Sequence, residues 1–409
     1  MNQKFGNGTS AQNVSTGING ASRLRFVGVE DLGSGTKATF WLEMQPSFQN
    51  GTTNSAGLFN RGAWAGLSDA KLGEIRVGRQ GTNNVAAVCD IDQQGCYTGA
   101  YGGGILFSGQ AAPGFQGAAL FAANPTRGGV AQSTGAGFAY SQTVNGTVTT
   151  ARTNGDLITN VQASSTGDVN QTNPNAWSQD STRYVRAIRY SLPTLVTGLS
   201  LNATQAFGQT LSTGGQSGNT TGFDGNYVNG PLKITAAYQK ADGEATVTGG
   251  VKSAVGASGE LTTLGAIYNF GFMSLGAGMQ TEKATASSVN VAGTSSALLF
   301  TKAEAFALTA LFPMGAFTPY VKYGERKYSG GAAQQYNAAG TASANPYYNA
   351  TTAKVTNIGI RYAFSKNTYA YADYMSNGAE MLTKSATAGG NSSSPSIKDQ
   401  TNVGLTINF

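Results

Sequence analysis

The chain contains 409 residues, of which only 11% are charged, and its formal net charge is +6. A soluble globular domain usually carries about 25% charged residues and a disordered chain has few aromatic residues, whereas this chain has 18 Tyr and 19 Phe. No run of about 18 apolar residues occurs, which excludes a membrane-spanning helix. The absence of His excludes His-dependent metal sites and His-based acid–base catalysis.

The N-terminal stretch, MNQKFGNGTSAQNVSTGINGAS, is interpreted as a polar loop without the apolar segment of a secretory signal. Fifteen segments in which apolar and polar residues alternate follow in chain order, separated by turns rich in Gly, Asn and Ser. Such alternation predicts strands with one apolar and one wet face. The predicted strands are 22–31, 37–44, 61–69, 73–80, 183–192, 197–207, 222–229, 230–239, 261–270, 272–280, 302–312, 316–327, 356–364, 367–375 and 401–409.

Most of these segments approach the ~10 residues that a tilted strand needs to cross a bilayer. The connections between them alternate between very short turns and long polar stretches such as 282–300, 328–353 and 378–399. Short turns at one end and long loops at the other are typical of a transmembrane antiparallel β-barrel. We therefore expect residues 1–409 to form a single barrel domain. The alternative is a large secreted all-β protein whose apolar faces form a core.

Residues 81–182 interrupt the series of strands. The segment is rich in Gly, Ala, Ser, Thr and Asn and contains no clear strand. A loop of this length in a compact fold is usually functional or poorly ordered. Within it, GAGFAYSQTV at 135–144 and GTVTTARTNG at 146–155 are predicted to form a small hairpin.

Several stretches occur together and in one order over most of the chain: SRLRFVGVEDLGSGTKATFWLE, AWAGLSDAKLGEIRVGRQ, RAIRYSLPTLVTGLSL, YVNGPLKITAAY, LGAIYNFGFMSLGAGM, IRYAFSKNTYAYADY and the closing NVGLTINF. In these stretches the sequence resembles the general porins of Gram-negative outer membranes, in the form typical of β-proteobacteria. The resemblance implies an all-β transmembrane barrel of 16 strands, a homotrimer, and a third long loop, here 81–182, that folds into the lumen as a constriction.

The sequence departs from the family at its beginning and in the greater length of its third loop. The family opens with an alternating strand of the form V-x-L-Y-G-x-V-D-x-G, which pairs with the C-terminal strand, and no such strand is found here. An unpaired strand edge in lipid is untenable. Three explanations stay open: the first strand is absent from this sequence, residues 1–10 pair poorly, or another segment closes the barrel.

If the apolar face of each strand meets lipid, the opposite face lines a water-filled lumen. Basic residues on that face predict a preference for anions, because Arg stays charged and presents a planar fork of donors. Arg79 shares the alternation of Val77, but it lies in the G-R-Q motif that the resemblance places at the constriction, where a bulge would turn it inward. Each Arg could instead be a rim residue without effect on permeation. The predicted basic residues are Arg23, Arg25, Arg76, Arg79, Arg183 and Arg189, and the opposing acidic residues are Glu43, Asp90 and Asp92.

The two cysteines, Cys89 and Cys96, both lie in the long loop. In a protein that folds beyond the periplasm they are expected to form a disulfide that staples the first part of this loop. A metal pair lacks other soft ligands to accompany it, and two free thiols are the remaining alternative.

The chain ends on an alternating strand with Phe409 as its last residue. A terminal strand of this kind resembles the signal that the barrel-assembly machinery of the outer membrane reads. The strand is also expected to close the barrel, and Phe409 as an aromatic of the membrane-interface girdle is compatible with both roles.

The sequence predicts a non-enzymatic, cofactor-free channel for passive diffusion of small hydrophilic solutes across the bacterial outer membrane, with a preference for anions. Catalysis is disfavoured because a Ser–His–Asp arrangement and a G-x-x-x-x-G-K-[ST] motif are both absent from the sequence. The expected partners are further copies of the chain, outer-membrane lipid and lipopolysaccharide, the barrel-assembly machinery, and small anions or hydrophilic solutes, but no nucleic acid. The alternatives are a structural or adhesive surface barrel and a substrate-selective porin whose long loop recognises one class of solute.

Overall fold

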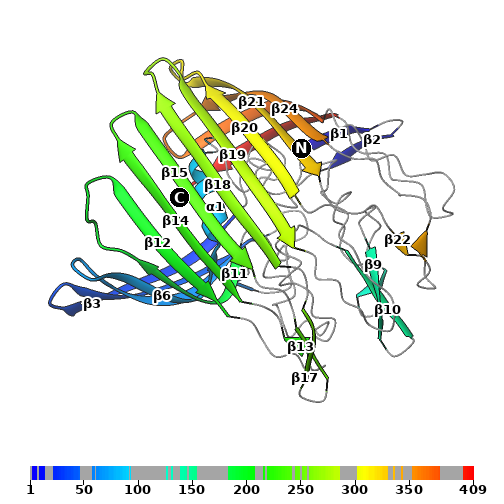
Figure 1. Ribbon diagram of the computed structural model, residues 1–409. Coiled ribbons are helices and arrows are strands. Elements are labelled where there is room, and N and C mark those ends of the chain that lie inside the picture. Colours follow the sequence, from blue (N-terminus) through cyan, green and yellow to red (C-terminus); the bar gives the residue numbers. More distant parts are fainter. Residues whose placement is uncertain are drawn as a thin grey trace.

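Fifteen long strands form the wall of the protein in the computed structural model (Figure 1). The structure describes residues 2–6, 9–13, 22–46, 58–59, 61–91, 93, 126–127, 130–131, 139–144, 147–153, 183–207, 215–216, 219–241, 245–248, 251–255, 258–285, 302–329, 335–336, 342–343, 352–377 and 399–409. The wall strands are β3 (Leu24–Gly33), β4 (Thr36–Met44), β5 (Gly62–Asp69), β6 (Gly73–Gly81), β11 (Arg183–Ser191), β12 (Leu199–Ala206), β14 (Thr220–Asn229), β15 (Leu232–Ala241), β18 (Ser258–Asn269), β19 (Ser274–Thr285), β20 (Lys302–Leu311), β21 (Phe317–Ser329), β24 (Thr352–Ala363), β25 (Thr368–Asn377) and β26 (Asp399–Ile407).

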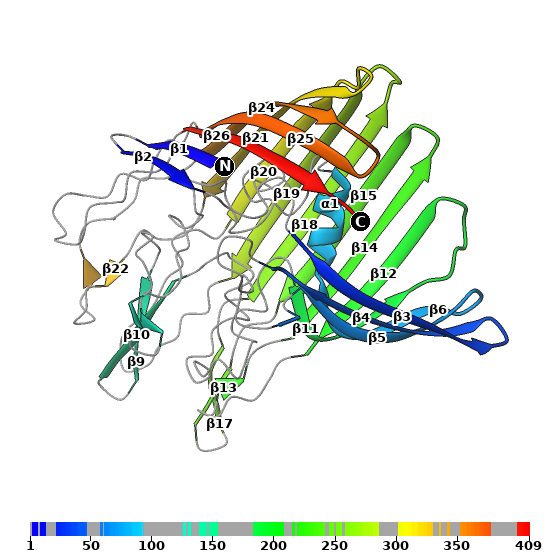
Figure 2. The same ribbon diagram turned by 180° about the vertical axis from the view of Figure 1, so that it is seen from behind.

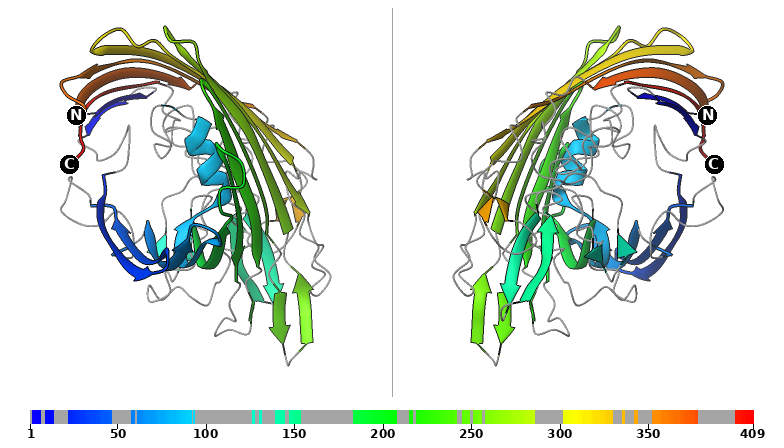
Figure 3. Two further views of the ribbon diagram at one scale, coloured as in Figure 1. Left: turned by 90° about the vertical axis from the view of Figure 1, so that its left-hand side faces the viewer. Right: turned by 90° about the vertical axis from the view of Figure 1, so that its right-hand side faces the viewer.

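Each wall strand pairs antiparallel with the next wall strand along the chain, from β3 to β26. All fifteen strands predicted from the alternation are present. Figure 3 shows that the sheet curls around an interior that holds a single helix among the described residues. The prediction of an antiparallel transmembrane barrel fold is therefore confirmed.

The N-terminal stretch is not a polar loop, because it contains two short strands, β1 (Asn2–Gly6) and β2 (Thr9–Asn13). They pair with each other, and β1 also pairs with the C-terminal strand β26, where Phe5 lies opposite Asp399 (Figure 2). The sheet thus has 17 strands. Among the described residues no pairing joins β2 to β3, so the sheet is not closed along that line.

The two faces of the wall differ as the alternation predicts. On β26, Val403, Leu405 and Ile407 expose 55%, 59% and 56% of their surface on the outer face, whereas the neighbouring Asn402 is fully buried. A barrel in a bilayer requires this arrangement, with an apolar band outside and polar side chains inside. Within the described part of the chain, no helix has the length and the apolar content needed to cross a membrane.

The strands are joined at one end by short turns and at the other by long segments of chain. The β3–β4 turn has positive φ at Gly33, Ser34 and Gly35, a conformation that glycine adopts without steric cost. The remaining described strands form small separate sheets beyond the wall (Figure 1): β7 (Thr126–Arg127) with β8 (Val130–Ala131), β9 (Ala139–Val144) with β10 (Thr147–Thr153), β13 (Gly215–Gln216) with β16 (Ala245–Thr248) and β17 (Val251–Val255), and β22 (Gln335–Tyr336) with β23 (Ala342–Ser343). The pairing of β9 with β10 confirms the hairpin predicted within the long loop.

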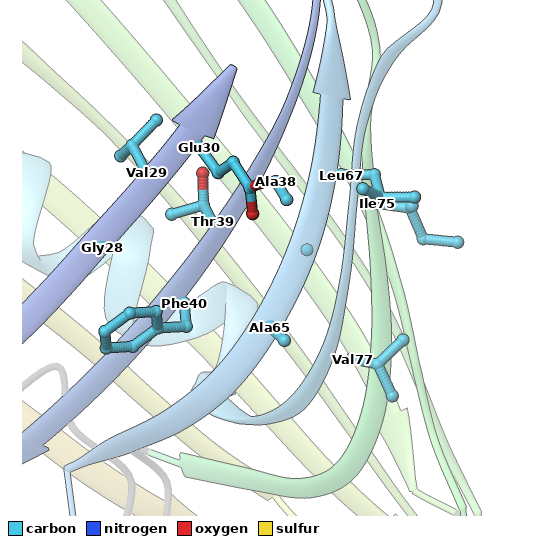
Figure 4. A pocket seen from close by; sticks show the side chains of 11 residues that line it. Gly28, Val29, Glu30, Ala38, Thr39, Phe40, Ala65, Leu67, Ile75 and Val77 are labelled. Carbon is cyan, nitrogen blue, oxygen red and sulfur yellow. The ribbon is translucent and has the colours of Figure 1, made fainter. Parts of the chain in front are cut away.

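The outer surface of β3–β6 is hollowed into an apolar groove of about 620 Å³. Figure 4 shows the side chains along it, contributed by four neighbouring strands. Phe40 lies over Gly28, where a Cβ atom would approach its Cε1 to 2.0 Å. The groove lies on the apolar side of the wall and is separated from the interior by the sheet. Its lining comprises Gly28, Val29, Glu30, Ala38, Thr39, Phe40, Ala65, Gly66, Leu67, Ile75 and Val77.

Candidate functional site

The interior of the curled sheet holds helix α1 (Asn83–Ile91), which follows directly after β6 (Figure 3). This helix was not predicted from the sequence. Thr82 caps the helix, because its hydroxyl accepts a hydrogen bond from the Val85 amide at 3.2 Å. Val85, Val88 and Ile91, three residues apart, are all buried. This spacing and the capping Thr were the available signals for a short helix.

Glycines on the inner face of the wall make room for α1. A Cβ atom at Gly222 of β14 would lie 2.1 Å from Asn83 Oδ1, and one at Gly265 of β18 would lie 2.2 Å from Ile91 Cγ1. A Cβ atom at Gly276 of β19 would lie 3.1 Å from the Ile91 carbonyl oxygen. The Asn83 and Ile91 side chains and the Ile91 carbonyl therefore approach the wall more closely than a side chain at these three positions would allow.

The first turn of α1 is bound to the wall through Asn83. Its amide donates to Asp224 Oδ1 at 2.5 Å, and its Oδ1 lies 3.0 Å from the hydroxyl of the buried Tyr184. Asp224 also accepts from Asn202 at 2.7 Å and forms an ion pair with Arg189 at 2.9 Å. Arg189 thus serves to hold the helix in place, and only 12% of its side chain is exposed.

The next residue, Asn84, is fixed by two further strands. Its Oδ1 accepts a hydrogen bond from Thr263 of β18 and another, at 2.9 Å, from Gln280 of β19. Gln280 also donates to the Thr263 hydroxyl at 3.0 Å. All three side chains are buried, and buried polar groups contribute to stability only when they are hydrogen-bonded.

The C-terminal end of α1 carries Asp90 and Cys89. Asp90 accepts a hydrogen bond from Lys233 of β15 at 2.6 Å, so this carboxylate faces the strands behind the helix. Asp90 therefore does not stand unpaired against the predicted Arg wall. Cys89 is disulfide-bonded. The predicted residues Asp92 and Cys96 lie outside the described residues.

A second group of polar residues lies on the inner face of β3–β6, where Arg25, Trp41, Trp64 and Arg76 form a continuous stack. Trp41 and Trp64 are directly opposite each other in the strand pairing, and their rings are parallel within 14° with centroids 5.8 Å apart. The guanidinium carbon of Arg25 lies 3.9 Å from the centroid of the Trp41 ring. That of Arg76 lies 4.4 Å from the centroid of Trp64. Contacts of this kind attract a cation to the face of an aromatic ring.

Each guanidinium group in the stack is also paired with a carboxylate. Glu43 lies 2.9 Å from Arg25 and 2.9 Å from Arg61, and Glu74 lies 2.5 Å from Arg76. Glu43 is almost completely buried. Glu43 thus binds two guanidinium groups, of which Arg61 was not predicted. Its role as an acidic residue of the constriction stays a prediction.

The remaining predicted Arg residues lie elsewhere. Arg23 precedes β3, is exposed, and interacts electrostatically with Glu43. Arg79 lies opposite Ala63 in the strand pairing, as Val77 lies opposite Ala65, so Arg79 and Val77 have the same place in the alternation. The Arg79 side chain is partly buried.

Arg183 does not alternate with Arg189 in the way that was expected. The pairing of β11 with β6 shifts between Tyr184 and Ala187, and Arg186 in this irregular segment has a φ of 48°. A bulge of this kind adds one residue and reverses the alternation beyond it. Tyr184 consequently contacts α1, and the Arg183 guanidinium donates instead to the backbone carbonyl of Arg61.

A curled antiparallel sheet with an apolar outer face, a polar inner face and a helix held inside it defines a transmembrane channel of the β-barrel class. The sequence profile described as Gram-negative porin matches residues 1–380. The chain therefore belongs to the Gram-negative porin family. It is a general diffusion channel of the bacterial outer membrane and not an enzyme.

Comparison with solved structures agrees with this assignment. The fold is similar to the anion-selective porin from Comamonas acidovorans, with a TM-score of 0.60 and 21% identity over 100% of this chain and 96% of that one. The fold is also similar to OmpF of Salmonella typhi, solved as a complex with daunomycin, with a TM-score of 0.53 and 17% identity over 100% of this chain and 95% of that one. For OmpT of Vibrio cholerae in its trimer form, the TM-score is 0.54 and the identity is 11% over 99% of this chain and 95% of that one. The search of curated protein sequences returned no match.

Proposed function

We propose that this porin favours small anions over cations. The observation that carries the proposal is the unequal exposure of the charges on the inner face of β3–β6. Arg25 and Arg76 expose 42% and 33% of their side chains, whereas their partners Glu43 and Glu74 expose 6% and 20%. A passing ion therefore meets more positive than negative charge.

The chemistry of the guanidinium group supports this proposal. Arg remains charged at every relevant pH, and a site that is open to water attracts ions without holding them, which conduction requires. The formal net charge of the chain, +6, is also positive and therefore favours anions as well. The Comamonas porin, which has the same fold, is described as anion-selective. That property belongs to the other protein and serves here only as support.

We further propose that residues 81–182 are the constriction loop of a single barrel domain spanning 1–409. Helix α1, the described part of this loop nearest to β6, lies inside the sheet and narrows the interior. Because Asp90 is paired with Lys233, the exposed Arg side chains of the opposite wall make the larger contribution to the field. A disulfide between Cys89 and Cys96 would fix the segment that leaves α1.

A homotrimer is the proposed assembly. OmpT of Vibrio cholerae, which has a similar fold, is described in a trimer form. The assembly can be tested by comparing unheated and heated samples of the purified protein on a denaturing gel. A band of three times the chain mass that disappears on heating is the expected result, and a single monomer band under the mildest conditions would contradict it.

The ion preference is tested in a planar lipid bilayer across a KCl gradient. The wild-type protein is expected to give a zero-current potential of the sign that favours chloride. The variants Arg25→Gln and Arg76→Gln should each lower the chloride-to-potassium permeability ratio. Lys366→Gln is the matched control, because it removes the same charge from the exposed turn between β24 and β25.

Two results would contradict the proposal. One is a wild-type ratio that favours potassium, and the other is an equal effect of Lys366→Gln and the two Arg substitutions. A correctly inserted barrel that does not conduct would favour the alternative of a surface-binding barrel. Conductance that saturates with one solute would favour a substrate-selective porin.

A further inference from the structure

Arg25, Trp41, Trp64 and Arg76 form a stack on the inner face of the wall. We propose that Trp41 and Trp64 are positioning residues for the ion preference: their paired indole rings hold the two guanidinium groups against the wall at a fixed place beside the lumen. This inference rests on the proposed anion preference. It assigns a role to two aromatic residues that carry no charge and that the strand alternation alone does not distinguish.

The stack is continuous across four neighbouring strands. Arg25 comes from β3, Trp41 from β4, Trp64 from β5 and Arg76 from β6, and each side chain contacts the next. The near-parallel indole rings leave their two outer faces for the two guanidinium groups. One Arg therefore lies at each end of the aromatic pair.

Glycines on the inner face leave space for the stack. A Cβ atom at Gly62 would lie 3.0 Å from both Cδ1 and Nε1 of Trp41. A Cβ atom at Gly66 would lie 3.2 Å from Cγ of Arg76. The wall thus has room for the Trp41 ring and for the aliphatic part of Arg76. This observation supports the stack independently of the distances between the rings and the guanidinium groups.

The carboxylates alone do not fix the orientation of the guanidinium groups. Glu43 and Glu74 each bind an edge of a guanidinium group, and an edge contact leaves the group free to rotate about the hydrogen bonds. A ring beneath the flat face removes this freedom. Because one edge and one face of each group are already occupied, the remaining edge is left to attract passing anions weakly.

The consequence for permeation is specific. Without the ring, the Arg side chain would keep its charge but would sample several positions, including ones closer to its carboxylate. The mean charge facing the lumen would then fall, and so would the preference for anions. A lysine in place of Arg76 would have the same effect for a different reason, because an ammonium group has no flat face to stack on the indole.

The test uses single-channel measurements on Trp64→Leu and Trp64→Phe. Trp64→Leu is expected to lower the chloride-to-potassium permeability ratio by about two- to fivefold, the factor that corresponds to an exposed cation–π contact. Trp64→Phe keeps an aromatic face and should stay close to wild type. Phe306→Leu is the control, since it breaks the aromatic pair of Phe306 and Tyr323, 5.7 Å apart, on another part of the wall.

A spectroscopic readout tests the geometry separately. Two stacked indoles couple their electronic transitions, so the wild-type circular dichroism spectrum should contain a paired positive and negative band from Trp41 and Trp64. Both Trp64 substitutions should abolish it, whereas Phe306→Leu should not. If Trp64→Leu fails to insert, Arg76→Lys takes its place, with the same expected fall in the ratio.

The outcomes separate this inference from the proposed function. An unchanged ratio in Trp64→Leu, together with a lowered ratio in Arg76→Gln, would overturn the positioning role and leave the anion preference intact. An unchanged ratio in Arg25→Gln and Arg76→Gln would overturn the proposed anion preference itself. A wild-type spectrum without the coupled bands would overturn the stack.

Discussion

Ile91 of α1 lies directly over Gly265 of β18, with no side chain of the wall between them. A Cβ atom at Gly265 would approach Ile91 Cγ1 to 2.2 Å and Cδ1 to 2.3 Å. The helix can approach the wall this closely at this point because Gly265 has no Cβ atom. Because the helix occupies the interior of the barrel, this contact also helps to set the free cross-section of the pore.

Gly265→Ala is expected to push α1 away from the wall and to lower the single-channel conductance. The added methyl group has no space, and overpacking of this kind typically costs about 1–3 kcal/mol. The measurement is conductance in a bilayer, combined with the temperature at which the folded form is lost on a gel. Gly81→Ala is the control, because a Cβ atom there would lie 3.9 Å from Val85 Cγ1, an ordinary contact.

The double variant Gly265→Ala with Ile91→Ala decides whether the helix contact is responsible. The smaller side chain at position 91 makes room for the new methyl group, so conductance should return towards the wild-type value. A conductance that stays low in the double variant would show that Gly265→Ala acts through the strand and not through α1.

Glu43→Gln is expected to increase the preference for chloride and to destabilise the barrel. The substitution removes one negative charge from the inner wall and leaves Arg61, of which only 7% of the side chain is exposed, without its carboxylate. Breaking a buried ion pair by changing one partner costs about 3–5 kcal/mol. The zero-current potential and the thermal unfolding of the barrel report the two effects.

Glu260→Gln serves as the control for this prediction. Glu260 lies 3.8 Å from Lys240 in a pair whose side chains are about half exposed, and exposed pairs contribute only about 0–1 kcal/mol. Its removal should leave both the potential and the unfolding temperature nearly unchanged. Equal shifts in the two variants would mean that Glu43 acts only through the net charge of the protein.

The sequence predicted the wall well because alternation is a local property. The contrast between Asn402 and Val403 can be read from two neighbouring letters, and the same rule located every wall strand. Helix α1 was missed because it has only three large aliphatic residues, Val85, Val88 and Ile91. The residues that fix it, such as Gly265, lie far away in the sequence.

The predicted pore residues were limited by a different effect. Alternation is followed residue by residue along one strand, and the irregularity between Tyr184 and Ala187 inserts one residue. Arg183 and Arg189 therefore do not follow a single alternation along this strand. Arg25 and Arg76 stack on Trp41 and Trp64. Their stacking depends on the register between strands, which no single strand contains.

Cys89 is expected to be bonded to Cys96 in the folded protein. Unfolded but unreduced protein should not react with a thiol reagent, and two thiols should react after reduction. A disulfide in a loop of this size contributes about 2–3 kcal/mol, and reduction should therefore loosen the end of α1 and increase the noise of the open channel. The double variant Cys89→Ser with Cys96→Ser should resemble the reduced protein, and a thiol that reacts before reduction would contradict the pairing.

Phe409→Ala is expected to reduce the amount of assembled protein in the outer membrane, whereas Phe409→Tyr should not. Phe409 follows β26, continues the outward alternation of Leu405 and Ile407, and is completely exposed. We propose that the assembly machinery recognises this exposed ring before the barrel forms. The fraction of heat-modifiable protein in isolated outer membranes measures assembly in the cell.

The same variants are then refolded from urea into detergent, where the machinery is absent and Phe409→Ala should fold as well as wild type. An equal loss in both measurements would mean that the ring stabilises the barrel itself and is not read as an assembly signal.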